Sequence, residues 1–108
     1  MKAKTVLRRR SARLDLDQAA DHYEAEAGPD VALRFVDAVE AAYRTIGERP
    51  SVGSSLWAEQ LGIAGLRSRP VARFPYLIFY LEEEEHVEVW RVLHARRDIP
   101  GELAGKEI

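Results

Sequence analysis

The sequence predicts an α+β fold in which an N-terminal strand and a two-helix hairpin pack on a small antiparallel sheet. Two amphipathic segments with helical spacing fill the first half of the chain, and three β-prone runs bounded by turn formers fill the second half. The 108 residues, 46% of them hydrophobic and 31% charged, suit a single globular domain over residues 1–108. We therefore expect a two-helix layer on one face of the sheet.

The N-terminal half begins with a short β-prone stretch at residues 5–7 and continues with two helices. Ser11 offers an N-cap oxygen to a first helix expected over Ser11–Ala27. Pro29 suits the first turn of a second helix, which should end near Arg49. The apolar positions of this second helix recur at helical spacing and are Val31, Phe35, Val39, Ala42 and Ile46. The short connection between the helices favours an antiparallel hairpin.

The second half predicts the sheet. After a loop expected over residues 50–64, strands are expected over Leu66–Val71, Tyr76–Leu81 and Val87–His94, joined as two consecutive antiparallel hairpins. Pro70 lacks an amide hydrogen, so its strand should lie at an edge, or Pro70 should occupy a position whose backbone nitrogen faces away from the neighbouring strand. The strand at residues 5–7 could join the same sheet.

Composition excludes several classes of protein. The chain has no cysteine, so we expect neither disulfides nor thiolate metal sites, and a reducing cytoplasm suits it. Asp15 and Asp17 follow the basic N-terminus at once, so no apolar signal-peptide core is expected. The longest apolar run is Tyr76–Leu81, far shorter than a membrane span. A net charge of -2 argues against stable direct binding to nucleic acid.

Arginines and one histidine gather in the last third of the chain. Arg67 and Arg69 are two residues apart, so they should share one face of a strand, and His94 ends the last strand. A proton carrier near several cations is the minimum that cleavage of RNA through the 2′-hydroxyl requires. The histidines His22, His86 and His94 lack the spacing of zinc ligands, and the glutamates at residues 82–85 suit a solvated hairpin tip, so no metal site is expected.

Five short motifs in order resemble the ParE branch of the RelE/ParE toxin superfamily, over about residues 5–98. These motifs are Leu14-Asp15-Leu16 with Tyr23, Arg34-Phe35-Val36, Gly65-Leu66-Arg67-Ser68, the strand from Tyr76 to Tyr80, and the segment from Arg91 to Asp98. The resemblance implies the toxin of a type II toxin-antitoxin system, of the kind linked with plasmid stabilisation. It also implies a ParD-like antitoxin that forms a hetero-oligomer with the toxin. The ParE branch is associated with inhibition of DNA gyrase, whereas the RelE branch cuts messenger RNA in the ribosome.

The leading hypothesis is a cytoplasmic gyrase inhibitor that is not an enzyme and uses no cofactor. Its target-binding residues are expected among the arginines and aromatic residues that dominate binding hot spots, with the sheet and the segment from His94 to Leu103 as the contacting region. The candidates are Arg67, Arg69, Arg73, Trp90, Arg91, His94, Arg96 and Arg97. The alternative is a RelE-like ribosome-dependent mRNA endoribonuclease, in which Arg67, Arg69 and His94 would act. No catalytic residue is assigned, and a member that binds only its antitoxin is the third possibility.

Two further expectations concern docking and the central loop. An exposed sheet edge would let an extended antitoxin tail add a strand, and an amphipathic antitoxin helix would pack on the helix hairpin. Trp57 in the loop either anchors that loop or meets a partner, and the sequence favours neither role.

Overall fold

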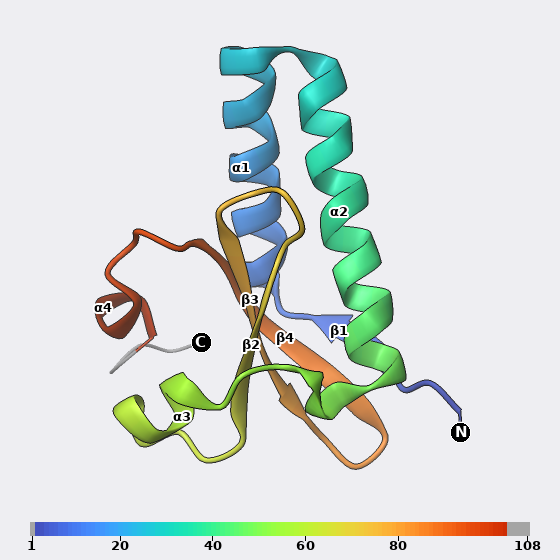
Figure 1. Ribbon diagram of the computed structural model, residues 1–108, viewed down its shortest axis with the longest axis vertical. Coiled ribbons are helices and arrows are strands. Elements are labelled where there is room, and N and C mark those ends of the chain that lie inside the picture. The colour runs from blue at the N-terminus through green and yellow to red at the C-terminus, as the bar shows by residue number, and fades with distance from the viewer. Residues whose placement is uncertain (1, 104–108) are drawn as a thin grey trace.

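The computed structural model describes residues 2–103, in which a helix hairpin packs against a four-stranded sheet (Figure 1). The expected α+β class is confirmed. The elements are, in chain order, β1 (Thr5–Arg8), α1 (Arg10–Ala27), α2 (Pro29–Glu48), a single 3₁₀ turn (Pro50–Val52), α3 (Leu56–Leu61), β2 (Leu66–Pro70), β3 (Tyr76–Glu82), β4 (His86–His94) and α4 (Ile99–Leu103). Met1 and residues 104–108 of the expected domain lie outside the described residues.

The sheet has the strand order β1-β4-β3-β2. The expected meander is confirmed, because β2 pairs antiparallel with β3 and β3 pairs antiparallel with β4. The N-terminal strand does join the sheet, but it runs parallel to β4, with Thr5 opposite His86 and Arg8 opposite Val89. Three helices, a 3₁₀ turn and two strands separate β1 from β4, and a connection of that length permits parallel pairing. The sheet is therefore mixed.

The helix hairpin forms where turn chemistry and apolar period predict it. Gly28 joins the helices with a φ of +95°, a conformation that glycine adopts without strain, and its amide donates to the carbonyl of Glu24. Pro29 begins α2, as expected. The predicted N-cap is wrong, because α1 starts at Arg10 and the hydroxyl of Ser11 donates instead to the carbonyl of Trp90, at 2.9 Å.

The main core lies between the helix hairpin and one face of the sheet. The buried apolar positions of α2 at helical spacing meet the residues of β3 and β4 that point to the same face. This cluster includes Phe35, Val39, Ile46, Ile78, Tyr80, Val87, Val89 and Val92. Burial of this apolar surface is the main force that holds the hairpin on the sheet.

A second core covers the opposite face of the sheet, which the sequence did not predict. Phe79 is fully buried on this face together with Leu66 and Leu93, and the residues that cover them come from α3 and α4 (Figure 1). The expected loop over residues 50–64 is thus wrong in its second half, which contains α3. Trp57 packs against this second core, so it anchors the segment.

Side chains and loops close most of the sheet edges. At the outer edge of β2, the amide of Leu66 donates to Ile63, the amide of Ser68 donates to Ser54, and Pro70 has no amide hydrogen, as the edge prediction required. Beyond the end of β1, α1 closes the edge of β4, because the Ser11 hydroxyl binds the Trp90 carbonyl and the Asp15 carboxylate binds the Val92 amide.

The outer edge of β1 is open at its centre. The amide of Arg9 donates a hydrogen bond to the carbonyl of Val89 on β4. Backbone groups alternate in direction along a strand, so those of Val6 and Arg8 point away from β4, toward the outer edge of the sheet. Lys4, before them, is already bonded to Gly47 of α2 at 2.9 Å. Within residues 2–103, both backbone groups of Val6 and the amide of Arg8 have no hydrogen-bond partner. The edge on which a further strand can pair is therefore that of β1.

Candidate functional site

Three of the predicted target-binding residues have structural partners. Arg67 donates to the carbonyl of Gly53 at 2.7 Å and so holds the loop before α3 against β2. Arg91 forms a two-pronged ion pair with Asp15 of α1, at 2.7 and 2.9 Å, and a weaker one with Glu102 of α4, at 3.3 Å. These bonds raise the pKa of Arg91, with the Asp15 hydrogen bonds as the main cause. Arg91 thus joins α1, β4 and α4.

Trp90 is the third residue with a structural role. The register between β3 and β4 shifts at this point, because Phe79 lies opposite Arg91 and Tyr80 lies opposite Val89, which leaves Trp90 as the extra residue of a bulge. Its half-buried ring lies under the Arg9 guanidinium, 4.4 Å from the ring centre, and its Nε1 donates to Glu88 at 3.2 Å. This cluster fixes the junction between β1 and α1.

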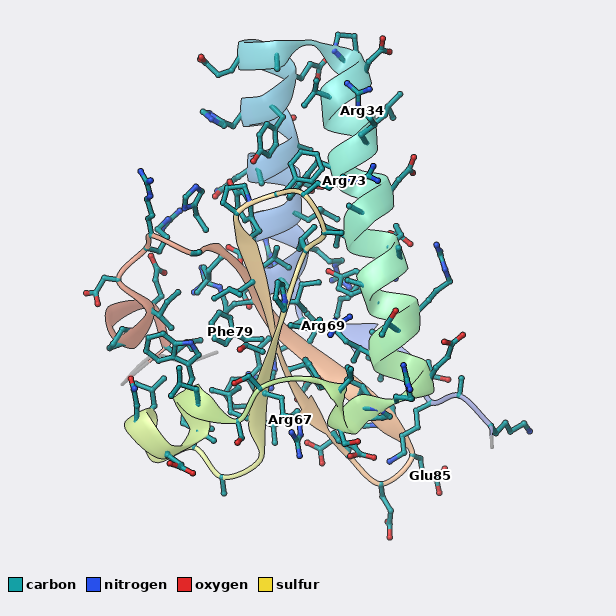
Figure 2. The ribbon with its side chains drawn as sticks, in the orientation of Figure 1. Arg34, Arg67, Arg69, Arg73, Phe79 and Glu85 are labelled. Carbon is teal, nitrogen blue, oxygen red and sulfur yellow. The ribbon has the colours of Figure 1, made fainter. Side chains whose placement is uncertain are left out.

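Arg69 and Arg73 keep their guanidinium groups uncommitted. Neither has a hydrogen bond or an ion pair within residues 2–103, and the same holds for Arg34 of α2. Figure 2 shows Arg73 at the tip of the β2–β3 hairpin, with Arg34 above it on α2 and with Arg69 and Arg67 following it down β2. Arg69 and Arg73 therefore lie along β2 and the tip of its hairpin, and Arg34 lies on the neighbouring α2.

A groove lies between α2 and the tip of the β2–β3 hairpin. This α2–hairpin groove has a volume of about 680 Å³, and its walls are formed by Val31, Arg34, Asp37, Ala38, Ala72, Arg73 and Phe74. Arg73 is the one non-glycine residue of the described chain with a positive φ, at +72°, a position in the turn where glycine is favoured. The ring of Phe74 contacts the rings of Tyr23 and Phe35 at 5.2 Å and thereby supports the turn from below. The fold thus holds Arg73 at the rim of an apolar groove despite local strain.

His94, Arg96 and Arg97 meet in a second hollow, between α1 and the end of β4. This α1–β4 cleft has a volume of about 420 Å³ and is lined by Asp15, Gln18, Ala19, His22, Tyr76, Val92, His94, Arg96 and Arg97. The amide of Arg96 donates to Nδ1 of His94 at 3.0 Å, and the ring of Tyr76 packs edge-on against the His94 ring at 5.1 Å. Burial raises the pKa of Tyr76, so its phenol keeps its proton at neutral pH. Sequence reasoning missed His22 and Tyr76 as members of this group.

The structure does not bring Arg67 together with His94. Arg67 of β2 lies opposite Tyr80 of β3, whereas His94 of β4 lies opposite Tyr76, at the other end of β3. Four residues along a strand and two strand spacings separate them by roughly 16 Å. The arginines beside His94 are Arg96 and Arg97, which follow it in the chain. The three residues considered for RNA cleavage therefore do not form one centre.

A third hollow follows the open edge of β1. It lies between β1 and α2, has a volume of about 270 Å³, and includes Val6, Arg8 and Tyr43 in its lining. The Tyr43 side chain is buried and its hydroxyl has no hydrogen-bond partner among residues 2–103. Burial raises the pKa of Tyr43 to about 12. A donor of hydrogen bonds thus lies near the unpaired backbone groups of Val6 and Arg8.

Residues 2–103 contain no group of three or more His, Cys, Asp or Glu side chains that could hold a metal ion. No helix in this part of the chain has the length and apolar character needed to cross a bilayer.

Comparison with known proteins identifies the family. A model of the family described as "ParE toxin of type II toxin-antitoxin system, parDE" matches residues 6–99. No curated protein matches the sequence. Among solved structures, a chain of the chromosomal ParDE toxin-antitoxin system from P. aeruginosa has the same fold, with a TM-score of 0.73, 20% sequence identity, and coverage of 85% of this chain and 96% of that chain. The chain, with its helix hairpin on a mixed sheet, therefore belongs to the ParE toxin family of type II toxin-antitoxin systems.

Proposed function

We propose that this toxin acts in the cytoplasm by binding and inhibiting DNA gyrase, and that a ParD-like antitoxin neutralises it in a hetero-oligomeric complex. In such a module the toxin contributes to plasmid stabilisation and carries out no chemical reaction of its own. The observation that carries the proposal is that Arg67 lies roughly 16 Å from His94, so the three residues considered for RNA cleavage do not all surround one phosphate.

The remaining arginines suit protein surfaces. Arg69, Arg73 and Arg96 have uncommitted guanidinium groups within residues 2–103, and Arg73 stands at the rim of a groove with apolar walls. Arginine beside apolar surface is typical of binding hot spots. We assign gyrase binding to Arg69, Arg96 and Arg97 together with the segment from His94 to Leu103.

The antitoxin is assigned two docking sites, one on each side of α2. An amphipathic antitoxin helix would place apolar residues in the α2–hairpin groove and carboxylates beside Arg34 and Arg73. An extended antitoxin tail would pair with the open edge of β1 at Val6 and Arg8. The closed edge of β2 leaves no comparable site there.

The target is tested by two assays on the same purified toxin, which are DNA supercoiling by gyrase and integrity of messenger RNA on translating ribosomes. We expect inhibition of supercoiling with intact message. Arg69→Ala and Arg96→Ala should weaken that inhibition by about tenfold each, as loss of a hot-spot contact does. Arg10→Ala is the control, because Arg10 is exposed and has no hydrogen bond or ion pair among the described residues. Cleaved message with unaffected gyrase would contradict the proposal.

The antitoxin sites are tested by hydrogen exchange of the toxin with and without the antitoxin encoded beside it. We expect slower exchange at the amides of Val6 and Arg8. Arg34→Glu and Arg73→Glu should weaken the complex by about tenfold or more, whereas Arg10→Glu should leave it unchanged. Unchanged exchange at Val6 and Arg8 would exclude the β1 edge as an antitoxin site. If Arg34→Glu and Arg73→Glu both bind the antitoxin as tightly as the unaltered toxin, the α2–hairpin groove is excluded as well.

A further inference from the structure

We propose that the α1–β4 cleft is a binding site for a phosphate group, presented either by a nucleotide or by a nucleic-acid backbone. The cleft is distinct from the α2–hairpin groove and from the β1 edge, since it is lined by α1, by the first residue of β3, by the end of β4 and by the turn that follows β4. The inference does not depend on gyrase as the target, because the binding belongs to the isolated toxin.

The carboxylate that lines the cleft, and one nitrogen of His94, already accept hydrogen bonds. Asp15 is its one carboxylate among the described lining residues, and both of its oxygens bind other groups. Oδ1 accepts from Arg91, and Oδ2 accepts from Arg91 and from the Val92 amide, at 2.7 to 2.9 Å. Nδ1 of His94 accepts the amide of Arg96. The bound negative charge of Asp15 is therefore balanced by Arg91 and does not repel an anion.

The groups left over are donors. When its Nδ1 accepts a hydrogen bond, a neutral imidazole carries its proton on Nε2, so His94 offers an N–H. The phenol of Tyr76 keeps its proton, and His22 and Gln18 bring further N–H groups from α1. Gln18 and Tyr76 also carry acceptor oxygens, but each can turn a donor toward the cleft, and several donors around one hollow form a site for an oxyanion.

Positive charge completes the site. The guanidinium of Arg96 has no side-chain partner in the described part of the chain. Arg97 donates one hydrogen bond, from Nη1 to a carboxylate oxygen of Glu102, at 2.5 Å. Guanidinium groups bind phosphate oxygens through paired, charge-assisted hydrogen bonds. A volume of about 420 Å³ also falls in the range of sites for small ligands. The arrangement of donors, charge and size therefore matches a phosphate group better than a neutral ligand.

Nuclear magnetic resonance of the full-length toxin tests the site. Inorganic phosphate is added against sodium chloride of equal ionic strength, and the side-chain signals of His22, His94 and Arg96 are followed. We expect saturable shifts at millimolar phosphate, with affinity lowered about tenfold by Arg96→Ala and by His22→Leu, as loss of a charge-assisted or neutral donor predicts. Arg10→Ala should bind phosphate like the unaltered toxin. Each variant must unfold at the same midpoint as the unaltered toxin, so that a folding defect is not mistaken for a loss of phosphate binding.

Two further titrations identify the source of the phosphate. A 5′-mononucleotide that binds at least as tightly as inorganic phosphate would assign the cleft to a terminal phosphate. A short DNA duplex that binds more tightly, and loses that gain in Arg96→Ala, would assign it to the backbone. Signals that stay unmoved with all three ligands would overturn the proposal, as would phosphate binding that survives both cleft variants.

Discussion

Removing the Asp15 carboxylate should destabilise the toxin far more than a typical surface change. The side chains of Asp15 and Arg91 are 10% and 17% exposed, and Asp15 accepts two hydrogen bonds from Arg91 and one from the Val92 amide. Breaking a buried ion pair from one side costs about 3–5 kcal/mol. Glu102 still faces Arg91 at 3.3 Å, which places Asp15→Ala near about 3 kcal/mol, or a fall in melting temperature on the order of 15 °C.

A double-mutant cycle isolates the pair from other losses. The free energy of unfolding is measured by urea denaturation for Asp15→Ala, Arg91→Met and the double variant. We expect a coupling energy of at least about 1.5 kcal/mol, because the two residues are in direct contact. Asp17→Ala, on an exposed position of the same helix, is the control and should change stability by less than about 0.5 kcal/mol. A coupling energy no larger than the stability change caused by Asp17→Ala would show that the ion pair between Asp15 and Arg91 does not hold α1 to β4.

Three more predictions concern single side chains. Tyr80→Phe should cost about 1–3 kcal/mol in urea denaturation, because the buried amide of Gly53 loses its acceptor at 2.9 Å; a change below about 0.5 kcal/mol would show that another group replaces it. Arg73→Gly should stabilise the free toxin by about 0.5–1 kcal/mol, because glycine relieves the φ of +72°, and a loss of stability would mean that the Arg73 side chain supports the turn. The hydrogen bond from Arg9 lowers the pKa of Glu88, so Glu88 adds stability above its ordinary pKa and loses it as the pH falls through the lowered value. Glu88→Gln should therefore be less stable than the unaltered toxin at about pH 7, with a difference that shrinks between about pH 5 and pH 3, and a pH-independent difference would rule out this linkage.

The long elements could be predicted because each buries one periodic face. The apolar period of α2 and the β-prone runs of β2, β3 and β4 need only local pattern to be recognised. The short helices could not, since α4 contains Pro100 and Gly101, which by themselves indicate a turn. One signal for the second layer was nevertheless present. The run Tyr76–Leu81 is apolar at successive positions, and a strand that is apolar on both faces needs cover on both.

The site depended on contacts that no local pattern contains. Asp15 and Arg91 are 76 residues apart, and nothing in either segment identifies the other as its partner. The bulge at Trp90 shifts the register of β4, so simple alternation does not tell which face Arg91 takes. The spacing of the histidines argues against a metal-ligand role for His22 and says nothing of its neighbours. Its place beside His94 follows from the packing of α1 against the end of β4.

The parallel pairing of β1 with β4 governs when this protein can fold. The paired residues, such as Thr5 and His86, come from opposite ends of the chain, so the first strand has no partner until the last strand has been made. Pairing over such sequence distances is slow, because the loop must close before any contact forms. During synthesis on the ribosome, the helix hairpin emerges early, with its apolar face exposed to solvent. The sheet that buries this face is completed only near the end of synthesis.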